Sequence, residues 1–412
     1  DNLFYMKILN DPIYGFITIR YPILLNLIDH PYFQRLNRIK QLGLSYLVYP
    51  GAHHTRFHHA IGAMHLMQEA IEVLKVKKIE ISEEEEVGVL IAILLHDIGH
   101  GPFSHALEHT LVEGVNHEDI SILLMDKLNE EFNGELDLAI EIFKNTYSKK
   151  FLHQLVSSQL DMDRLDYLKR DSFYSGVSEG VVSSDRIINM LNVENDELVI
   201  EEKGIYSIEK FIVARRLMYW QVYLHKTVLA AENLLVEILK RASYLASQGK
   251  QLHASPVLHD FLYNNYSKED FAQDEVLTSF TLLDDSDIYS AIKAWCSNED
   301  KTLSIISKSL INRNLPKISI ERVPFEKERI IELKNKVKTA YGLDDKEVNH
   351  LVFHSDIVNN AYNASSDKIN IKYKNGKVLD ITEASDNFNI QALTEPVKKY
   401  FVCYPKEFRN QW

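Results

Sequence analysis

The sequence predicts a mainly α-helical protein with a small α/β lobe at its C-terminal end. Most of the first 310 residues carry apolar positions at helical spacing, as in KTVLAAENLLVEILKRASYLAS (226–247), which contains neither Gly nor Pro. After Pro316 the pattern changes to short strand-like runs. These runs lie at 318–326, 351–358, 368–381 and 400–405. We therefore expect a helical domain over residues 1–310 and an α/β lobe over residues 311–412.

Local signals predict where several elements begin or turn. Ser82 and Asn116 each precede acidic residues and predict the N-caps of two helices. Asn375-Gly376, between alternating residues, predicts a β-hairpin with a type I′ turn. Two short alternating runs around Lys203-Gly204 predict a second hairpin, within the helical domain.

Composition and charge limit the class of protein. The formal net charge of -13 gives no reason to expect binding to nucleic acid, because that depends on lysine and arginine neutralising phosphates. Two distant cysteines, Cys296 and Cys403, argue against a disulfide framework or a thiolate zinc site and favour the cytoplasm. No apolar run near the central motif approaches the roughly 20 residues that cross a bilayer, and no secretory signal is recognisable. We therefore expect no membrane association.

Histidine is concentrated in one part of the chain. Ten of the 17 histidines lie between His53 and His117. The segment LLHDIGHGPFSH (94–105) ends an apolar run with a His-Asp pair and then adds two more histidines. Buried imidazoles and carboxylates are costly unless they are paired or bind an ion. This segment therefore predicts a metal site, and imidazole with carboxylate ligands suits Mn, Fe, Zn, Co or Ni.

The helical period places these side chains together. His96 and His100 are four residues apart, so they lie about 40° apart around a helix, with Asp97 beside them. Gly101-Pro102 is expected to end that helix. A second helix would then carry His105, Glu108 and His109 at helical spacing.

Downstream segments supply further candidates. Asp163, Tyr167 and Asp171 recur at four-residue intervals and form one stripe of a helix. Three interleaved residues are interpreted as its solvated face with one ion pair: Asp161, Asp166 and Arg170. In NHEDIS (116–121) the helix start explains Asn116 and Asp119 but leaves His117 and Glu118 unassigned.

The order RFHH, HD, H, NHE and D resembles the HD-domain phosphohydrolases. Five longer motifs, spread over roughly residues 7 to 240, resemble the deoxynucleotide triphosphohydrolase branch, which includes bacterial dGTPases and the animal sterile-alpha-motif and HD-domain dNTPase. They are DPIYGFITI, FQRLNRIKQLG, YPGAHHTRFHHAIG, HDIGHGPFSH and DRLDYLKRD. The resemblance implies an HD-domain helical core and hydrolysis of a dNTP to deoxynucleoside and inorganic tripolyphosphate.

The resemblance also implies roles for individual residues. The metal ligands would be His59, His96, Asp97 and Asp163, with His58 as a competitor for His59 because the family more commonly has Glu before the ligand histidine. The ion could be Mn, Mg, Fe, Zn, Co or Ni. The catalytic side would comprise His100, His105, Glu108, His117 and Glu118. Among these, His105 would be the general acid, with Glu108 fixing its tautomer.

The substrate contacts implied by the resemblance fall into two sets. Phosphate contacts would come from Arg56, Arg164 and Arg215, which would reconcile a polyanionic substrate with an acidic protein. Gln41 and Asp171 would bind the 3′-hydroxyl, and Tyr167 would pack under C2′ and exclude ribonucleotides. Leu42 and Tyr223 would form the sugar-side and base-side walls, although a core leucine and a helix-face aromatic explain them equally well.

Relatives assemble as tetramers or hexamers, and several are activated by nucleotides. Four residues resemble part of an activator pocket: Lys7, Asp29, Gln34 and Asn37. Asn37 replaces an arginine that reads guanine, which disfavours GTP and leaves another (d)NTP as the activator. Ordinary surface-charge roles would also explain all four residues.

Two other function classes remain open on the sequence alone. One is a different HD phosphohydrolase, such as a nucleotidase or a cyclic-nucleotide phosphodiesterase, because the same metal ligands would serve it. The other is a catalytically silent nucleotide-sensing scaffold. A panel of substrates separates these classes from a dNTP triphosphohydrolase.

Overall fold

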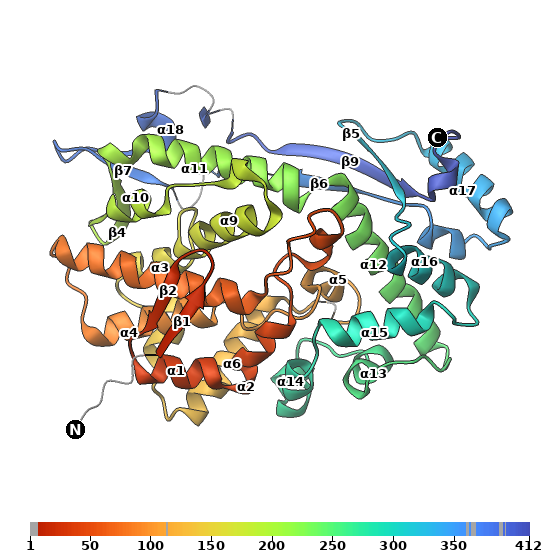
Figure 1. Cartoon of the computed structure of the whole chain (residues 1–412), viewed down its shortest axis with the longest axis horizontal. Coiled ribbons are helices and arrows are strands. Elements are labelled where there is room, and N and C mark those ends of the chain that lie inside the picture. The colour runs from red at the N-terminus through yellow and green to blue at the C-terminus, as the bar shows by residue number, and fades with distance from the viewer. Residues whose placement is uncertain (1–6, 113, 360–361, 364–367, 387–389, 392) are drawn as a thin grey trace.

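The computed structural model of the protein describes residues 7–112, 114–359, 362–363, 368–386, 390–391 and 393–412. Helices dominate the chain up to residue 311, and short strands and helices share the rest, which confirms the predicted fold class (Figure 1). The helices that build the site are α3 (Arg56–Val76), α4 (Glu83–Leu95), α5 (Ser104–Glu108), α6 (His117–Glu131), α9 (Met162–Ser175), α11 (Ile205–Met218) and α12 (Lys226–Ser247). Among the described residues, no helix combines the length and apolarity that crossing a membrane would require.

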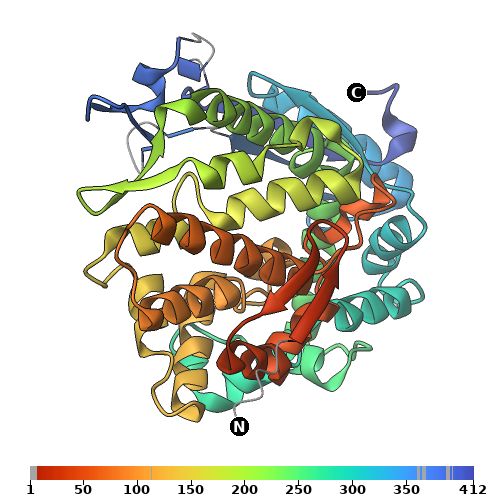
Figure 2. The ribbon, with the colours of Figure 1, turned by 60° about the vertical axis from the view of Figure 1, so that its left-hand side comes forward.

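The central helices are buried on most of their surface. Helix α3 packs between α4 and α9, and the hairpin of β1 (Lys7–Asp11) and β2 (Gly15–Ile19) lies against it (Figure 2). Helix α4 starts with a capping box, in which the backbone N–H of Glu85 donates to Ser82 Oγ at 3.1 Å. Its apolar residues from Val89 to Leu95 are all essentially inaccessible to solvent. The apolar run before the His-Asp pair therefore anchors the site in the core.

The other helical segments surround this centre. The α-helices among them are α1 (Pro22–Asp29), α2 (Pro31–Gln34), α7 (Asp137–Phe143), α8 (Lys150–Val156), α10 (Ser184–Asn189), α13 (Pro256–Tyr263), α14 (Asp274–Thr281), α15 (Asp285–Trp295), α16 (Lys301–Ile311), α17 (Lys327–Tyr341) and α18 (Ile381–Ala384). The 3-10 turns are η1 (Arg35–Arg38), η2 (Gly43–Leu47), η3 (Ser178–Gly180), η4 (Glu202–Gly204), η6 (Asp270–Ala272), η7 (Glu347–His350) and η8 (Lys406–Phe408), and η5 (Tyr219–Tyr223) is a π-helical turn. Helix α12 has the bounds that its periodicity predicts.

The strands form two sheets besides the β1–β2 hairpin. One is an antiparallel sheet in the order β5 (Lys317–Glu321), β9 (Val397–Tyr404) and β6 (Phe353–Asn359). Phe401 and Cys403 of β9 pack on Leu229 and Ala230 of α12 in a small separate core. The C-terminal sheet is thereby fixed to a helix of the first domain.

The second sheet has the order β3 (Leu191–Glu194), β4 (Glu197–Glu201), β7 (Asn370–Lys372) and β8 (Val378–Asp380). Strand β7 pairs in parallel with β4, so this sheet crosses the boundary predicted at residue 311. The division into residues 1–310 and 311–412 stays a prediction.

One of the two predicted hairpins exists, whereas the hairpin predicted around Lys203-Gly204 is wrong because the residues after that dipeptide start α11. The β3–β4 hairpin turns at Asn195 and Asp196, whose φ angles of 51° and 63° suit a type I′ turn, and not at Lys203-Gly204, which lies in η4. The β7–β8 hairpin contains Asn375-Gly376, but only Gly376 has a positive φ, 83°. That turn is therefore not of type I′, which requires positive φ at both central residues.

Candidate metal and catalytic site

The first ligand candidate comes from the start of α3. Thr55 is the N-cap, and a capping box places the His58 ring against the Thr55 backbone N–H, with His58 Nδ1 accepting at 3.2 Å. The next residue, His59, is fully buried, and its Nε2 lies 3.0 Å from Asp163 Oδ1. His58 therefore caps the helix, whereas His59 faces the candidate site.

The His-Asp segment is a turn and not the predicted continuation of α4. Helix α4 ends at Leu95, because backbone groups beyond it bind side chains instead: His96 C=O accepts from Ser121 Oγ at 3.1 Å, and Gly99 N–H donates to the same oxygen at 2.9 Å. The buried Arg35 guanidinium donates to Ile98 C=O at 2.8 Å and to His100 C=O at 2.6 Å. Tertiary hydrogen bonds, and not a helical period, thus position His96, Asp97 and His100.

The predicted ligands converge at this turn. One ligand atom from each of His59, His96 and Asp163 lies within 4.8 Å of the others. His96 donates from Nδ1 to Ile93 C=O at 2.6 Å, which leaves Nε2 to face the cluster. Asp97 Oδ1 lies 3.4 Å from His96 Nε2, and Asp97 Oδ2 accepts from Arg56 Nη1 at 2.8 Å. Two imidazoles and two carboxylates so close together can hold a divalent metal ion.

The imidazoles and carboxylates of the cluster shift one another's pKa values. Burial would raise the pKa of Asp163, but the imidazoles of His96 and His59 outweigh burial and hold the pKa below its usual range. Burial would lower the pKa of His59, but the hydrogen bonds that its ring donates to Asp163 and Asp166 raise this pKa to about 10. The carboxylates thus favour positive charge at this point, which is the electrostatic requirement of a cation site.

A buried carboxylate behind His59 corrects the interpretation of α9. His59 Nδ1 donates to Asp166 Oδ2 at 2.7 Å, so Nε2 is the nitrogen that faces Asp163. Arg170 donates to both oxygens of Asp166, from Nε at 3.0 Å and from Nη2 at 3.1 Å, and also to Asp11 Oδ2. Asp161, Asp166 and Arg170 are all fully buried, so the prediction of a solvated helix face is wrong. The spacing of Asp166 and Arg170 in the sequence suits an exposed ion pair as well as a buried one. Only the packing of α9 against α3 shows that the pair is buried.

Asp166→Asn is expected to weaken metal binding about 10- to 100-fold, because losing an outer carboxylate loosens the tautomer and orientation of a ligand histidine. Calorimetric titration with Mn²⁺ on purified wild type and variant measures this. Asp185→Asn, on the exposed start of α10, is the matched control. Equal Mn²⁺ affinities of Asp166→Asn and wild type would contradict the orienting role.

Three of the predicted catalytic residues, His100, Glu108 and His117, belong to a hydrogen-bonded chain centred on Glu108. His117 Nδ1 donates to Glu108 Oε1 at 3.2 Å, and Ser104 Oγ donates to the same oxygen at 2.9 Å. His100 Nδ1 donates to Ser104 Oγ at 2.9 Å, and the rings of His100 and His117 stack with centroids 3.8 Å apart. Burial and Arg56 lower the pKa of His100 to about 3, so this ring is neutral.

His105 stands apart from this chain. Its ring packs edge-to-face on His109 with centroids 4.5 Å apart. Glu108 Oε1 accepts from Ser104 and His117, and that Glu108 fixes the tautomer of His105 stays a prediction. The chain reverses through Phe103, which has a left-handed φ of 48° and starts a helix of only five residues. Burial lowers the pKa of His105.

The three predicted phosphate contacts share an unusual feature. Arg56, Arg164 and Arg215 each have a buried Nε–H group that finds no hydrogen-bond partner in the part of the chain that the structure describes. Arg164 Nη1 donates to Asp161 Oδ2 at 2.5 Å, and Arg215 Nη1 donates to Gln159 Oε1 at 3.5 Å. Arg35 Nε also lacks a partner among the described residues, so this feature is not confined to the predicted phosphate contacts, whose role stays a prediction.

Asp171, one of the predicted sugar contacts, is hydrogen-bonded by two side chains. Its two oxygens accept from His54 Nε2 at 2.6 Å and from Tyr223 Oη at 2.7 Å. The Tyr167 ring lies between His59 and Tyr223, with centroid distances of 6.5 and 6.0 Å. The buried Gln41 Oε1 has no partner among the described residues. Sequence reasoning missed His54, although it is part of the histidine-rich YPGAHHTRFHH segment.

Two cavities divide the predicted residues. A cavity of about 480 Å³ is lined by His96, Asp97 and Asp163, together with His117 and Glu118. A second cavity of about 870 Å³ is lined by Leu42, His105 and Tyr223, and its far wall comes from β6. The predicted metal ligands His96, Asp97 and Asp163 and the predicted base walls therefore line two different cavities.

Two carboxylates that the sequence did not suggest, the half-buried Glu232 and the buried Asp285, hold the loop of Gln41 and Leu42. Leu44 N–H donates to Glu232 Oε1 at 2.8 Å, and Lys40 N–H donates to Asp285 Oδ2 at 3.0 Å. Gly43 between them has a φ of +50°, and a Cβ there would lie 2.7 Å from Glu232 Oε1. The positive φ thus favours glycine in this loop, and a larger residue would also displace the Glu232 carboxylate.

Glu232 makes stability depend on pH. Burial raises its pKa from 4.5 to about 7, so between these values the native carboxyl retains a proton that the unfolded chain has lost. Its contribution therefore lowers the stability of the wild type as pH rises from about 4.5 to 7. Glu232→Gln keeps an acceptor for Leu44 without this titration, and its free energy of unfolding relative to wild type is expected to rise by up to about 3 kcal/mol between pH 4.5 and 8. Urea unfolding at both pH values measures it, and a pH-independent difference would contradict the assignment.

The predicted activator residues lie at the surface in two pairs. Lys7 Nζ and Asp29 Oδ1 are 3.6 Å apart. Asn37 Nδ2 donates to Gln34 Oε1 at 3.2 Å, and Gln34 Nε2 donates to Ile28 C=O at 2.8 Å. These contacts satisfy the four side chains without a ligand, so an activator role stays a prediction.

Comparisons with known proteins agree with this geometry. Residues 56–171 match the HD domain and residues 182–258 match the HD associated region. A phosphohydrolase crystal structure from Bacteroides thetaiotaomicron is 54% identical, with a TM-score of 0.94 over 97% of this chain and 99% of that chain. The uncharacterized protein YwfO from Bacillus subtilis is 33% identical over 92% of this chain and 88% of its own length.

More distant relatives carry a named activity. The deoxynucleoside triphosphate triphosphohydrolase SAMHD1 homolog of Dictyostelium discoideum is 32% identical over 60% of this chain. The chain spans about half the length of that relative. HD domains bind divalent metal ions, in keeping with the cluster of His59, His96 and Asp163. The chain therefore belongs to the HD-domain phosphohydrolases of the family related to the deoxynucleoside triphosphate triphosphohydrolases.

Proposed function

We propose that the protein is a metal-dependent dNTP triphosphohydrolase, which converts a dNTP and water to a deoxynucleoside and inorganic tripolyphosphate. The observation that carries this proposal is the cluster of His59, His96 and Asp163 with two arginines beside it, Arg56 bound to Asp97 and Arg164 bound to Asp161. A triphosphate is the kind of polyanion that both features suit. Named SAMHD1 relatives support the same substrate class.

In this proposal His59, His96, Asp97 and Asp163 hold a divalent ion, with Mn, Mg, Fe, Zn, Co and Ni as candidates. A bound divalent ion would supply Lewis acidity that activates water and neutralises charge on phosphoryl oxygens. Arg56, Arg164 and Arg215 bind the triphosphate oxygens. Water forms a bond to the α-phosphorus and gives a proton to Nε2 of His117, the bond from phosphorus to the 5′ oxygen breaks, and His105 donates a proton to that oxygen.

The remaining residues position the nucleotide and the water. Glu108 orients His117 through Nδ1, which leaves Nε2 of His117 to accept a proton or a hydrogen bond. Glu118, exposed at the rim of the smaller cavity, completes this side. The sugar lies between Tyr167 and the Gln41–Leu42 loop, and the base lies against Tyr223 in the larger cavity. Homo-oligomeric assembly and activation by a (d)NTP belong to the same proposal.

Product analysis tests the function. Each dNTP, singly and in pairs, is incubated with Mn²⁺ or Mg²⁺, and phosphate products are separated by ion-exchange chromatography. Tripolyphosphate with deoxynucleoside, and no product from ribonucleotides, supports the proposal, and turnover only in mixtures reveals activation. Orthophosphate as the only phosphate product identifies a different HD phosphohydrolase. Binding without turnover identifies a nucleotide-sensing scaffold.

A further inference from the structure

His54 connects the two side chains that are predicted to bind the sugar 3′-hydroxyl. Its ring donates from Nε2 to Asp171 Oδ1 at 2.6 Å. Its backbone C=O accepts from the N–H of Gln41 at 3.0 Å. Asp171 lies on α9 and Gln41 lies in the loop before η2, so the two contacts come from distant parts of the chain. One residue therefore holds both of them.

The surroundings of the His54 ring fix its orientation. The side chain has no exposed surface, and the ring stacks on Tyr174 with centroids 4.6 Å apart and planes 12° apart. The next residue, Thr55, pairs with Lys40 in an isolated β-bridge. A ring confined in this way keeps its N–H donor directed at Asp171 and gives the carboxylate one orientation.

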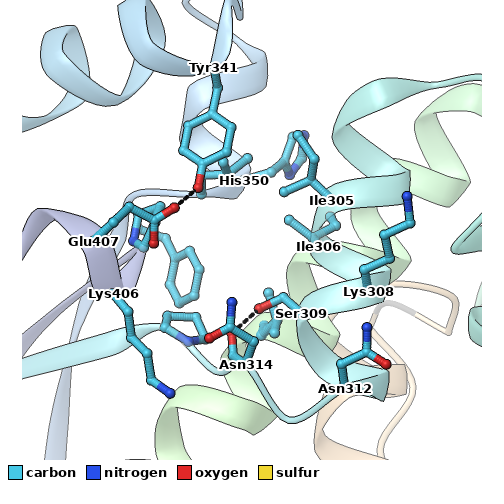
Figure 3. A pocket seen from close by; sticks show the side chains of 15 residues that line it. Ile305, Ile306, Lys308, Ser309, Asn312, Asn314, Tyr341, His350, Lys406 and Glu407 are labelled. Atoms are coloured by element: carbon cyan, nitrogen blue, oxygen red, sulfur yellow. Dashed lines mark hydrogen bonds between the residues drawn. The ribbon is translucent and has the colours of Figure 1, made fainter.

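The His54 ring reaches a ligand only through its partners. His54 is absent from the described residues that line the two cavities of the proposed site. It is also absent from the cavity of about 240 Å³ beside Tyr341 and His350 (Figure 3). By contrast, Tyr223, which donates to the second oxygen of Asp171, lines the larger cavity of the proposed site. His54 is therefore placed to position Asp171 and not to contact a nucleotide.

The polar atoms around His54 favour a role beyond packing. Its Nδ1 is buried without a hydrogen-bond partner among the described residues, and such an atom lowers stability and offsets the gain from the bond to Asp171. A carboxylate has about four lone-pair positions, so the donors His54 and Tyr223 leave others for a ligand. The buried Gln41 Oε1 also has no partner within the described part of the chain. A hydroxyl group, which both donates and accepts, suits these two partners.

We propose that His54 is a positioning residue that makes the site select nucleotides with a 3′-hydroxyl. Its ring fixes the carboxylate of Asp171 that accepts from this hydroxyl, and its backbone fixes the loop of Gln41. This inference rests on the proposed function, in which both side chains bind the sugar. Loss of the Nε2 donor then weakens nucleotides that carry the hydroxyl and spares those that lack it.

Two variants separate the ring nitrogens. His54→Asn keeps a polar atom near the Nδ1 position only, whereas the longer amide of His54→Gln places an N–H near the Nε2 position. Steady-state rates are measured for dATP, dCTP, dGTP and dTTP, each beside its 2′,3′-dideoxy counterpart. In His54→Asn, kcat/KM is expected to fall about ten- to hundredfold for the dNTP and less than about threefold for the dideoxynucleotide. His54→Gln is expected to stay within about threefold of wild type for both. His53→Asn, at the exposed neighbouring position, is the control and is expected to change neither.

Equal losses for both classes of nucleotide in folded His54→Asn would overturn the proposal, because a merely structural role lowers both rates alike. If circular dichroism shows that His54→Asn is unfolded, His54→Phe replaces it, since this variant keeps a ring against Tyr174 and removes the donor. Unfolding of both variants would make His54 structural and would also overturn the proposal.

If wild type turns over no dNTP, the proposed function fails, and calorimetric titration of the same nucleotide pairs with Mn²⁺ decides the role of His54. A wild-type preference for the 3′-hydroxyl that disappears in His54→Asn and persists in His54→Gln supports the proposal. A wild type without this preference, in turnover or in binding, overturns it.

Discussion

Asp163→Asn is expected to abolish metal binding and to lower dNTP turnover at least about 10³-fold while the protein stays folded. The carboxylate lies 3.0 Å from His59 Nε2 and 3.4 Å from His96 Nε2, at the centre of the ligand cluster. An amide of the same shape supplies no negative charge, so the charge stabilisation of several kcal/mol that a metal provides in phosphoryl transfer is lost.

Three measurements on Asp163→Asn separate this effect from unfolding. Elemental analysis gives the metal content, steady-state kinetics gives kcat, and circular dichroism reports the fold. Asp185→Asn serves as the control here too, because that carboxylate is exposed and its nearest lysine nitrogen is 3.8 Å away. A folded Asp163→Asn protein with normal metal content or turnover would remove Asp163 from the ligand set.

His105→Gln is expected to reduce kcat about 10²- to 10⁴-fold, the usual contribution of a general acid, with little change in metal content. His105 lines the larger cavity, whereas the ligand cluster lines the smaller one. His109→Gln is a close control, since the two rings are in contact and line the same cavity. The kcat of His109→Gln is expected to fall less than about threefold.

The leaving group distinguishes an acid from a residue that only shapes the cavity. The 5′ oxygen of a deoxynucleoside leaves as a poor alkoxide unless it is protonated, whereas a nitrophenolate does not need a proton. The defect of His105→Gln is therefore expected to be much smaller with bis(4-nitrophenyl) phosphate than with a dNTP. Equal defects with both substrates would assign His105 to binding alone.

Sequence reasoning located the metal cluster because its residues belong to short motifs. His96 and Asp97 are adjacent, and the stripe with Asp163 follows from the helical period of α9. The prediction that one helix carries both His96 and His100 was nevertheless wrong. Helix α4 ends at Leu95, and contacts from Arg35 and Ser121 hold the turn that follows. Motif recognition succeeds here where helical geometry does not.

Residues that act through distant partners could not be identified from the sequence. Asp166 and Arg170 look like a surface pair at a spacing of four until α3 and β1 bring His59 and Asp11 to them. Glu232 and Asp285 approach the loop at residues 40–44 from helices about 190 and 245 residues away. The sequence gives no local signal that these carboxylates are buried or half-buried, because burial depends on how the helices pack.

The measurement that tests the proposed chemistry most directly is hydrolysis of a dNTP in water enriched in ¹⁸O, followed by mass spectrometry of both products. Attack at the α-phosphorus predicts one ¹⁸O atom in tripolyphosphate and none in the deoxynucleoside. Label in the deoxynucleoside, or labelled orthophosphate in place of tripolyphosphate, would contradict a dNTP triphosphohydrolase acting at this site.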